Sequence, residues 1–496
     1  MRSELVAALA IACASCGSGC DGERARKTTA PPRVSEGSDT VSSSVPVIAP
    51  GDAAAELAAA PSFLDAPPGS LDQLFGALVA AERRDTNARV DLAFFGDSHT
   101  AGDSMTSRLR ATWQARFGDA GRGVVAAGRP PTRHYYQRDV RYGRSGEWTA
   151  AVGGGRHAND KEPFGIAGLR VSGQQKGAQL WVETCSDCAA GTSVAQLEIL
   201  YFAAPDRGLL RFRVDDGAWK DLPTRTHAIE PPHPGRFVIT VPDGPHKLLL
   251  EHGGGGAIDL FGVVMERGKP GVIVDSLGVV GRRLGSLRSW DWSVIGEQLA
   301  ARDPRLVVLQ YGTNEADDPD LDLEAMARYF DETILRIRAA APTASILVLG
   351  PPDVGVREAG KACDRPRPAT KIDAGVIPEC EWRTPAVLGE IIATAHAAAR
   401  RNQVAFFDTY GAMGGADQMH AWFLAEPKIA YKDHVHFTDV GYQKWADTLT
   451  AATFALYERW RTAHGLPQSA PITLPPAESR PPDEPSPGEP PPAVAP

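Results

Sequence analysis

Two long stretches of the chain, residues 68–165 and 268–465, alternate short apolar runs with longer amphipathic segments. A short run without a polar face is typical of a strand buried on both sides. Such strands, alternating with helices, form parallel sheets that helices cover on both faces. We therefore predict one α/β domain built from both stretches. Its expected strands are 90–95, 272–276, 306–311, 346–350 and 404–408, and its expected helices are 71–84, 101–117, 322–340, 384–401 and 438–461.

The segment between these stretches, residues 166–267, has a different pattern. Polar and apolar positions alternate in segments such as LRFRV and RFVITV, and Asp-Gly or Gly-rich turns separate them. A period of two predicts half-buried strands, and turns of this kind predict hairpins. We expect an antiparallel β-sandwich inserted between the first and second strands of the α/β domain.

Both ends of the chain lack this periodicity. Residues 21–67 are rich in Ser, Ala, Pro and Asp and predict a disordered linker, and residues 466–496 predict a Pro-rich disordered tail. Residues 1–20 predict a signal peptide, with Arg2 followed by an apolar segment at 5–12. The protein is therefore expected to be exported.

Three cysteines, Cys13, Cys16 and Cys20, lie at the end of the predicted signal peptide. Small residues before Cys16 and Cys20 are similar to those of a bacterial lipoprotein signal, in which the first mature residue is a lipidated cysteine. Plain secretion with fortuitous cysteines is the alternative. Both interpretations predict a location in the periplasm or cell envelope.

Composition narrows the possible partners. The 496 residues are 43% hydrophobic, which suffices for a packed core, and the net charge is −9. No stripe of Lys and Arg stands out, so a nucleic-acid partner is not expected. No apolar run reaches the roughly 18–20 residues that span a bilayer, so any membrane attachment is expected through a lipid anchor.

Four further cysteines form two close pairs in the sequence, Cys185 with Cys188 and Cys363 with Cys380. An even number in an exported chain predicts two local disulfides. A redox-active Cys-x-x-Cys motif is the less favoured alternative, because no thioredoxin-like context surrounds Cys185. A zinc site is less favoured still, because the second pair lacks the spacing of a zinc knuckle.

Ser98 directly follows the first predicted strand, in the segment DLAFFGDSHTAGD, and precedes a predicted helix. Ligands of open α/β sheets bind at this carboxyl edge. Gly-Asp-Ser alone is more often a turn with an N-capping serine. The G-x-S-x-G motif of α/β-hydrolases is absent from the sequence.

Asp433 and His436 lie near the end of the folded region, in the segment KDHVHFT. This spacing allows one loop to present both groups, so that the carboxylate holds the imidazole in the tautomer that accepts a serine proton. The alternative is a purely structural role, as a surface loop with Thr438 as a helix N-cap. His434 is a rival base, although its two-residue spacing favours the opposite side of the loop. A metal site formed by these residues lacks a convincing further ligand.

Two more turns follow predicted strands. Asn314 in QYGTNE can donate an amide hydrogen to a developing oxyanion, and Gly281 in LGVVGR can offer a backbone N–H. Taken singly, both are ordinary turn residues. Together with Ser98 and His436, however, they supply a nucleophile, a base and oxyanion donors at one edge of the predicted sheet.

The order Ser, Gly, Asn, Asp-x-x-His resembles that of the SGNH (GDSL-like) hydrolase superfamily, over residues 90–165 and 270–460. The resemblance implies a flavodoxin-like three-layer α/β/α domain. It also implies that Ser98, Asp433 and His436 form the catalytic triad, and that Ser98, Gly281 and Asn314 form the oxyanion hole. No cofactor or metal is implied. Val280 departs from the polar residue often found before the family's glycine, which makes Gly281 a less secure match.

A narrower resemblance, carried by GDSHTAGDSMTSRLRATWQARFGDAGRG, by the inserted β-rich segment and by DHVHFTDVGY, is to bacterial peptidoglycan O-acetylesterases and their acetyltransferase relatives. It implies a jelly-roll-like insertion that binds carbohydrate, and hydrolysis of small acyl esters, mainly O-acetyl, on a polysaccharide. The alternatives are an O-acetyltransferase that uses the same triad and a non-catalytic glycan-binding surface protein. Trp290, Trp292 and Tyr311 are candidates for sugar stacking, although core packing is the commoner role.

Overall fold

The computed structural model describes residues 57–130, 136–154, 163–357, 382–470 and 474. The predicted signal peptide, most of the predicted linker and most of the predicted tail lie outside the described residues. So do Cys363 and Cys380. The described helices include none that is long and apolar enough to cross a membrane.

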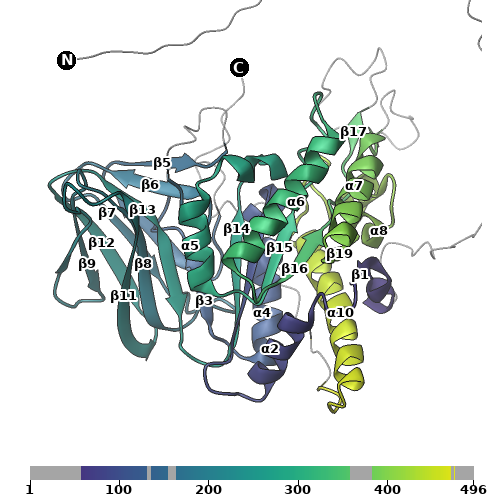
Figure 1. Ribbon diagram of the computed structural model, residues 1–496, viewed down its shortest axis with the longest axis horizontal. Coiled ribbons are helices and arrows are strands. Elements are labelled where there is room, and N and C mark those ends of the chain that lie inside the picture. The colour runs from purple at the N-terminus through teal and green to yellow at the C-terminus, as the bar shows by residue number, and fades with distance from the viewer. Residues whose placement is uncertain (1–56, 131–135, 155–162, 358–381, 471–473, 475–496) are drawn as a thin grey trace, which may run out of the picture. The chain divides into compact units, whose positions relative to one another are not determined.

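A six-stranded sheet forms the centre of the α/β region (Figure 1), and five of its strands are parallel. In chain order the parallel strands are numbered one to five, and their spatial order is 2-1-3-4-5, the flavodoxin-like order. A short antiparallel strand occupies one edge. From that edge, the strands are β1 (Leu64–Asp65), β19 (Ala405–Phe407), β16 (Ser345–Leu349), β15 (Leu306–Gln310), β2 (Arg89–Gly96) and β14 (Gly271–Gly278).

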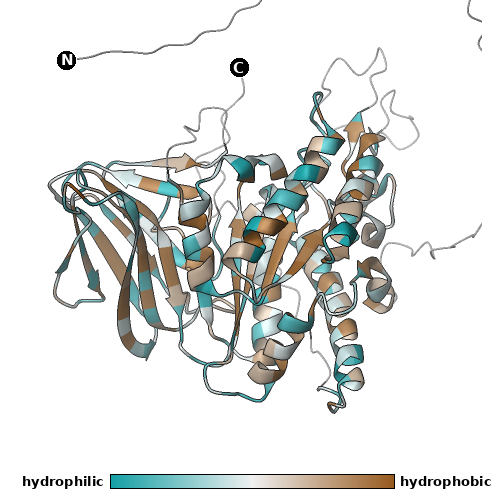
Figure 2. Ribbon diagram, in the orientation of Figure 1, coloured by the Kyte–Doolittle hydropathy of each residue, from teal (hydrophilic) through white to brown (hydrophobic). Residues whose placement is uncertain are grey.

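The central strands are buried on both faces, as their apolar sequences predict, and Figure 2 shows this apolar character in brown. Alternate side chains enter different cores: Phe94 packs in one hydrophobic cluster and Phe95 in the other. Full burial of such a side chain stabilises the fold by about 1.5–3 kcal/mol. One cluster contains helices α2 (Asp72–Glu82), α4 (Ser104–Phe117) and α10 (Asp439–Ala463), and the other contains α5 (Trp292–Arg302), α6 (Leu323–Ala340) and α7 (Val387–Arg401).

Two antiparallel sheets are formed by the chain between β2 and β14, and their facing side chains share a third hydrophobic cluster. The five-stranded sheet has the order β10 (Lys220–Pro223), β9 (Leu209–Val214), β12 (Lys247–Gly254), β7 (Gln179–Glu183) and β4 (Arg141–Ser145). The six-stranded sheet has the order β11 (His233–Gly244), β8 (Val194–Ala203), β13 (Ile258–Glu266), β6 (Leu169–Gly173) and β5 (Trp148–Val152), with β3 (Gly121–Val125) paired to β13.

The six-stranded antiparallel sheet also packs against the α/β region. Every residue of β13 is buried, because Leu260 and Val263 enter the core between the antiparallel sheets while Phe261 and Val264 enter the helical cluster that contains α5. The antiparallel region is thus joined to the α/β region by a continuous apolar contact.

Three predicted boundaries change. The linker predicted to end at residue 67 ends earlier, because Leu64–Asp65 pairs with β19, a strand too short to show periodicity. The antiparallel region begins before residue 166, with β3, β4 and β5. The helix predicted at 101–117 is broken at Asp103, whose φ of 53° lies in the left-handed region, and a separate short helix, α3 (Ser98–Ala101), precedes it.

The remaining short elements are the 3₁₀ helices η1 (Ala60–Phe63) and η2 (Leu284–Ser289), the helices α8 (Thr409–Met413) and α9 (Gln418–Leu424), and a two-stranded sheet of β17 (Val356–Arg357) and β18 (Trp382–Arg383). Of these, η2 and β18 lie beside loops that carry candidate site residues.

Candidate active site

Ser98 is the first residue of α3, two residues beyond the end of β2. Asp97 caps this helix by accepting a hydrogen bond from the His99 N–H at 2.9 Å. Gly96 is required for the tight approach, because a Cβ there would lie 2.2 Å from Thr100 Oγ1 and 2.8 Å from Gln310 Oε1. The Gly-Asp-Ser segment therefore holds Ser98 at the carboxyl edge of the parallel sheet.

His436 approaches Ser98 from the loop that precedes α10. Its Nε2 lies 2.8 Å from Ser98 Oγ, although the two residues are 338 positions apart. Its Nδ1 lies 2.8 Å from Asp433 Oδ2. The structure thus brings the three residues proposed as a triad into one continuous chain of hydrogen bonds. Thr438 caps α10 through a hydrogen bond from the Gly441 N–H.

Asp433 is held as a carboxylate by its own loop. Its Oδ1 accepts hydrogen bonds from the N–H groups of Val435 and His436, each at 3.0 Å. Partial burial by itself raises the pKa of Asp433, but the hydrogen bonds from the His436 ring and from the two N–H groups outweigh it and lower the pKa to about 2. Asp433 is therefore charged over the whole neutral range and can stabilise a protonated His436.

Two other histidines surround this pair without replacing it. His99 is fully buried beneath His436, and burial lowers its pKa well below the usual value. His434 faces away from Ser98: its ring stacks on Trp382 at 3.5 Å, its Nε2 lies 2.9 Å from His420 Nδ1, and its Nδ1 donates to the Lys432 carbonyl at 3.0 Å. This orientation makes His436 the histidine that contacts Ser98.

Asn314 and Gly281 lie on the loops that follow the two strands flanking β2. In the sheet register, Gly96 is paired with Gln310 of β15 and with Gly278 of β14, so the three loops leave the sheet at the same edge. Asn314 Nδ2 donates to the Arg282 carbonyl at 3.0 Å. Gly281 has a φ of +70°, and its left-handed conformation rather than lack of space favours glycine.

Two buried acids near these loops were not identified from the sequence as functional. Burial raises the pKa of Asp97 to about 6, against the opposing effect of the His99 N–H. Burial likewise raises the pKa of Glu315 to about 7, although its oxygens accept hydrogen bonds from the N–H groups of Leu284 and Gly312. The sequence alone does not show whether an acid in a strand-to-helix turn is buried or exposed to solvent.

The aromatic candidates for sugar stacking are mostly part of the core. Trp290 and Tyr311 are buried in the cluster that contains α5, and Trp292 packs against it and donates from Nε1 to the Leu287 carbonyl. In the antiparallel region, Trp148 is buried, whereas Trp181 and Trp219 are partly exposed.

The cysteine predictions have separate outcomes. Cys185 and Cys188 form a disulfide with an S–S distance of 1.90 Å. Cys363 and Cys380 lie outside the described residues, so their pairing stays a prediction. Within the described part of the chain, the one group of metal-binding side chains comprises Cys185, Asp187 and Cys188, and two of these are the disulfide cysteines.

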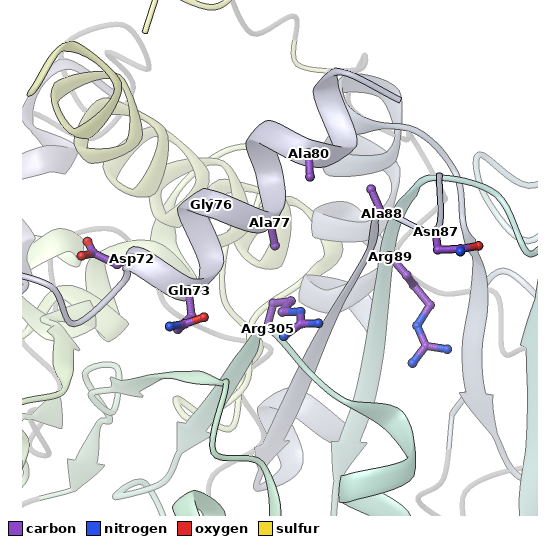
Figure 3. A pocket seen from close by; sticks show the side chains of 9 residues that line it. All are labelled: Asp72, Gln73, Gly76, Ala77, Ala80, Asn87, Ala88, Arg89 and Arg305. Carbon is purple, nitrogen blue, oxygen red and sulfur yellow. The ribbon is translucent and has the colours of Figure 1, made fainter. Parts of the chain in front are cut away.

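A polar hollow of about 260 Å³ lies at the opposite edge of the parallel sheet, between α2 and the beginnings of β2 and β15 (Figure 3). Arg89 and Arg305 lie on its strand side, and Gln73 and Ala77 of α2 face them. It lacks the paired nucleophile and base found around Ser98, so we place the candidate active site at the carboxyl edge.

The model of the GDSL-like lipase/acylhydrolase family matches residues 252–444, which include Gly281, Asn314, Asp433 and His436. Ser98 lies outside the matched residues. No curated protein sequence matches the chain.

The fold is similar to that of a solved structure. The structure of a peptidoglycan O-acetylesterase is 23% identical, and the match covers 80% of this chain and 99% of that one, with a TM-score of 0.63. A family two carbohydrate esterase from Cellvibrio japonicus is 11% identical over 67% of this chain and 97% of its own, with a TM-score of 0.24, too low to support an argument. Residues 252–444 thus match a GDSL-like acylhydrolase domain, and this match supports a carboxylic ester hydrolase.

Proposed function

We propose that this protein is an exported serine esterase that removes O-acetyl groups from a polysaccharide such as peptidoglycan. The observation that carries the proposal is the chain of hydrogen bonds from Ser98 through His436 to Asp433, with 2.8 Å at each step. A serine, a histidine and a charged carboxylate in this order form the arrangement that activates a hydroxyl for acyl transfer.

The chemistry follows from these contacts. His436 Nε2 removes the Ser98 proton as Oγ attacks the ester carbonyl, and Asp433 stabilises the resulting imidazolium. The N–H groups of Ser98 and Gly281 and the amide of Asn314 hold the oxyanion. His436 then gives its proton to the sugar oxygen as the bond from that oxygen to the acyl carbon breaks, and the sugar leaves as an alcohol. His436 next removes a proton from the water that hydrolyses the acetyl-enzyme.

Exposure of the site supports a polymeric substrate. The side chains of His436 and Asp433 are 36% and 48% exposed, so the ester need not enter a closed cavity to reach Ser98. The structurally similar peptidoglycan O-acetylesterase supports a glycan ester as the substrate class. In this proposal the antiparallel region is a jelly-roll-like sandwich that binds the glycan chain.

Export is supported by two features of the chain. Residues 1–20 have the pattern of a signal peptide, and the Cys185–Cys188 disulfide is typical of oxidising compartments. We place the enzyme in the periplasm or cell envelope, with lipid attachment through one of the early cysteines as one form of that proposal.

The test is release of acetate from O-acetylated peptidoglycan by the wild-type protein and by Ser98→Ala, with and without a glycan acceptor. We expect acetate release without an acceptor, and a loss on the order of 10⁴–10⁶-fold in a folded Ser98→Ala protein. Near-wild-type release by Ser98→Ala would refute the mechanism. Turnover that requires the acceptor would instead identify a transferase.

A further inference from the structure

Glu315 is a buried acid whose carboxyl oxygens contact backbone N–H groups. Its residue is 3% exposed, and among the described residues it takes part in no salt bridge. A buried carboxylate is costly unless hydrogen bonds replace its lost hydration. Here two backbone N–H groups do so: Leu284 N–H donates to Oε1 at 2.8 Å, and Gly312 N–H donates to Oε2 at 3.0 Å.

These two N–H groups belong to different loops. Gly312 lies in the loop after β15 that carries Asn314, whereas Leu284 begins η2, three residues after Gly281. One side chain therefore fastens together the two loops that carry the proposed oxyanion donors. Each carboxyl oxygen accepts one of the two hydrogen bonds, so the side chain bridges the loops, although burial raises its pKa to about 7.

Further hydrogen bonds fix Asn314 between the same loops. Its Nδ2 donates to the Arg282 carbonyl, and its own carbonyl accepts from Arg283 Nε at 3.1 Å. Arg283 is in turn paired with Asp318. Because an amide NH₂ has two hydrogens, Asn314 can keep its bond to Arg282 and still offer the second hydrogen to an oxyanion.

We infer that Glu315 is a positioning residue of the oxyanion hole, which sets the Asn314 amide and the Gly281 loop in register by holding the Gly312 and Leu284 N–H groups. The inference rests on the proposed serine-esterase function and adds a member to its site. Misplacement of a reacting group by about 1 Å can lower the rate about 10²-fold. Loss of the Glu315 hydrogen bonds is therefore expected to affect the transition state more than substrate binding.

The first test compares Glu315→Gln with Asn314→Ala and with the double variant, on nitrophenyl acetate. Glu315→Gln keeps the shape of the side chain but presents an NH₂ to one of the two N–H donors. We expect kcat to fall by about 10–10²-fold with KM little changed. The double variant should lose less than the product of the two single losses, because both changes disturb one oxyanion hole.

The matched control is Glu198→Gln, a change of the same chemistry at a buried acid of the antiparallel region, where Glu198 pairs with Arg236. It should leave kcat unchanged even if it lowers stability. Glu315→Asp, which keeps the charge but is too short to reach both N–H groups, replaces Glu315→Gln if that variant does not fold. Wild-type kcat in the folded Glu315 variant, or fully multiplicative losses in the double variant, would overturn the inference.

Hydrogen exchange of the Gly312 and Leu284 amides gives a readout that needs no activity. Both amides should exchange faster in Glu315→Gln than in the wild type. Unchanged exchange would overturn the inference that Glu315 holds the two loops. An inactive wild type would refute the proposed function, while the exchange rates would still decide whether Glu315 holds the loops.

Discussion

Two aspartate–histidine pairs occur in different regions of this molecule and look almost alike. At the carboxyl edge of the parallel sheet, Asp433 holds His436 Nδ1 at 2.8 Å. In the antiparallel region, Asp215 holds His246 Nδ1 at 2.7 Å. In both pairs the second carboxylate oxygen accepts backbone N–H hydrogen bonds, and in both the pKa of the aspartate is lowered against the opposing effect of desolvation.

The pairs differ in what the other imidazole nitrogen meets. His436 Nε2 faces the Ser98 hydroxyl, which can donate a proton, whereas His246 Nε2 faces the Pro242 carbonyl, which can only accept. His246 must therefore donate from Nε2 and has no lone pair to offer a hydroxyl. An aspartate–histidine pair alone therefore does not make a base, because the group at the second imidazole nitrogen decides whether that nitrogen can accept a proton.

The largest difference between the two pairs is expected for Asp433→Asn. The asparagine amide would donate to Nδ1, which forces the proton onto Nε2 and leaves it unable to accept from Ser98. We expect kcat to fall on the order of 10⁴-fold. Steady-state hydrolysis of nitrophenyl acetate measures it, and Asp215→Asn, the same change in the other pair, should keep wild-type kcat. Equal losses in both variants would contradict the distinction between the pairs.

A smaller effect is expected from Asn314→Ala, which leaves both aspartate–histidine pairs intact. The lost amide donor stabilises charge that develops only in the transition state, so kcat should fall by about 10²–10³-fold with little change in KM. Initial rates over a range of ester concentrations separate the two parameters. A rise in KM at constant kcat would assign Asn314 to ground-state binding.

The smallest expected effect is on stability, and it differs in sign between Asp97 and Asp433. The pKa of Asp97 is raised to about 6, so the folded state binds its proton more tightly than the unfolded chain does. Its contribution to the free energy of unfolding is therefore lost as pH rises from about 4 to about 6, by about 3 kcal/mol at most. The pKa of Asp433 is lowered to about 2, so its contribution is present above pH 4 and lost as pH falls toward 2.

Urea unfolding of Asp97→Asn across this pH range tests the first sign. Asparagine can still cap α3, so the variant should show a flatter dependence between pH 4 and 6 than the wild type. A steeper fall in that window would show that Asp97 is not the buried acid responsible.

Much of the fold could be predicted from local sequence patterns. Runs such as Val90–Phe95 lack a polar face because both faces of the strand are covered, and this can be read without knowing what covers them. The order of Ser98, Gly281, Asn314 and His436 likewise placed each residue after a strand or in the last loop, because the carboxyl ends of parallel strands share one edge.

What the sequence does not reveal depends on distant contacts. The strand Leu64–Asp65 exists only because β19 offers an edge to pair with, and the helix break at Asp103 depends on its buried contacts with Arg110 and Arg122. Glu315 is similar: its role depends on the Leu284 N–H, 31 residues away. The Asp215–His246 pair shows that local geometry can also mislead. Its geometry resembles that of a catalytic pair, and the contact of His246 Nε2 with the Pro242 carbonyl distinguishes it.

In the proposed mechanism Ser98 carries the acyl group, and this is tested by trapping the acetyl-enzyme. Protein mixed with nitrophenyl acetate and quenched in acid during turnover is digested, and its peptides are examined by mass spectrometry. We expect an acetyl group on Ser98 in the wild type and in Asp215→Asn, and no acetylated residue at this position in Ser98→Ala. Turnover without an acetylated Ser98 peptide, or with the acetyl group on another residue, would contradict it.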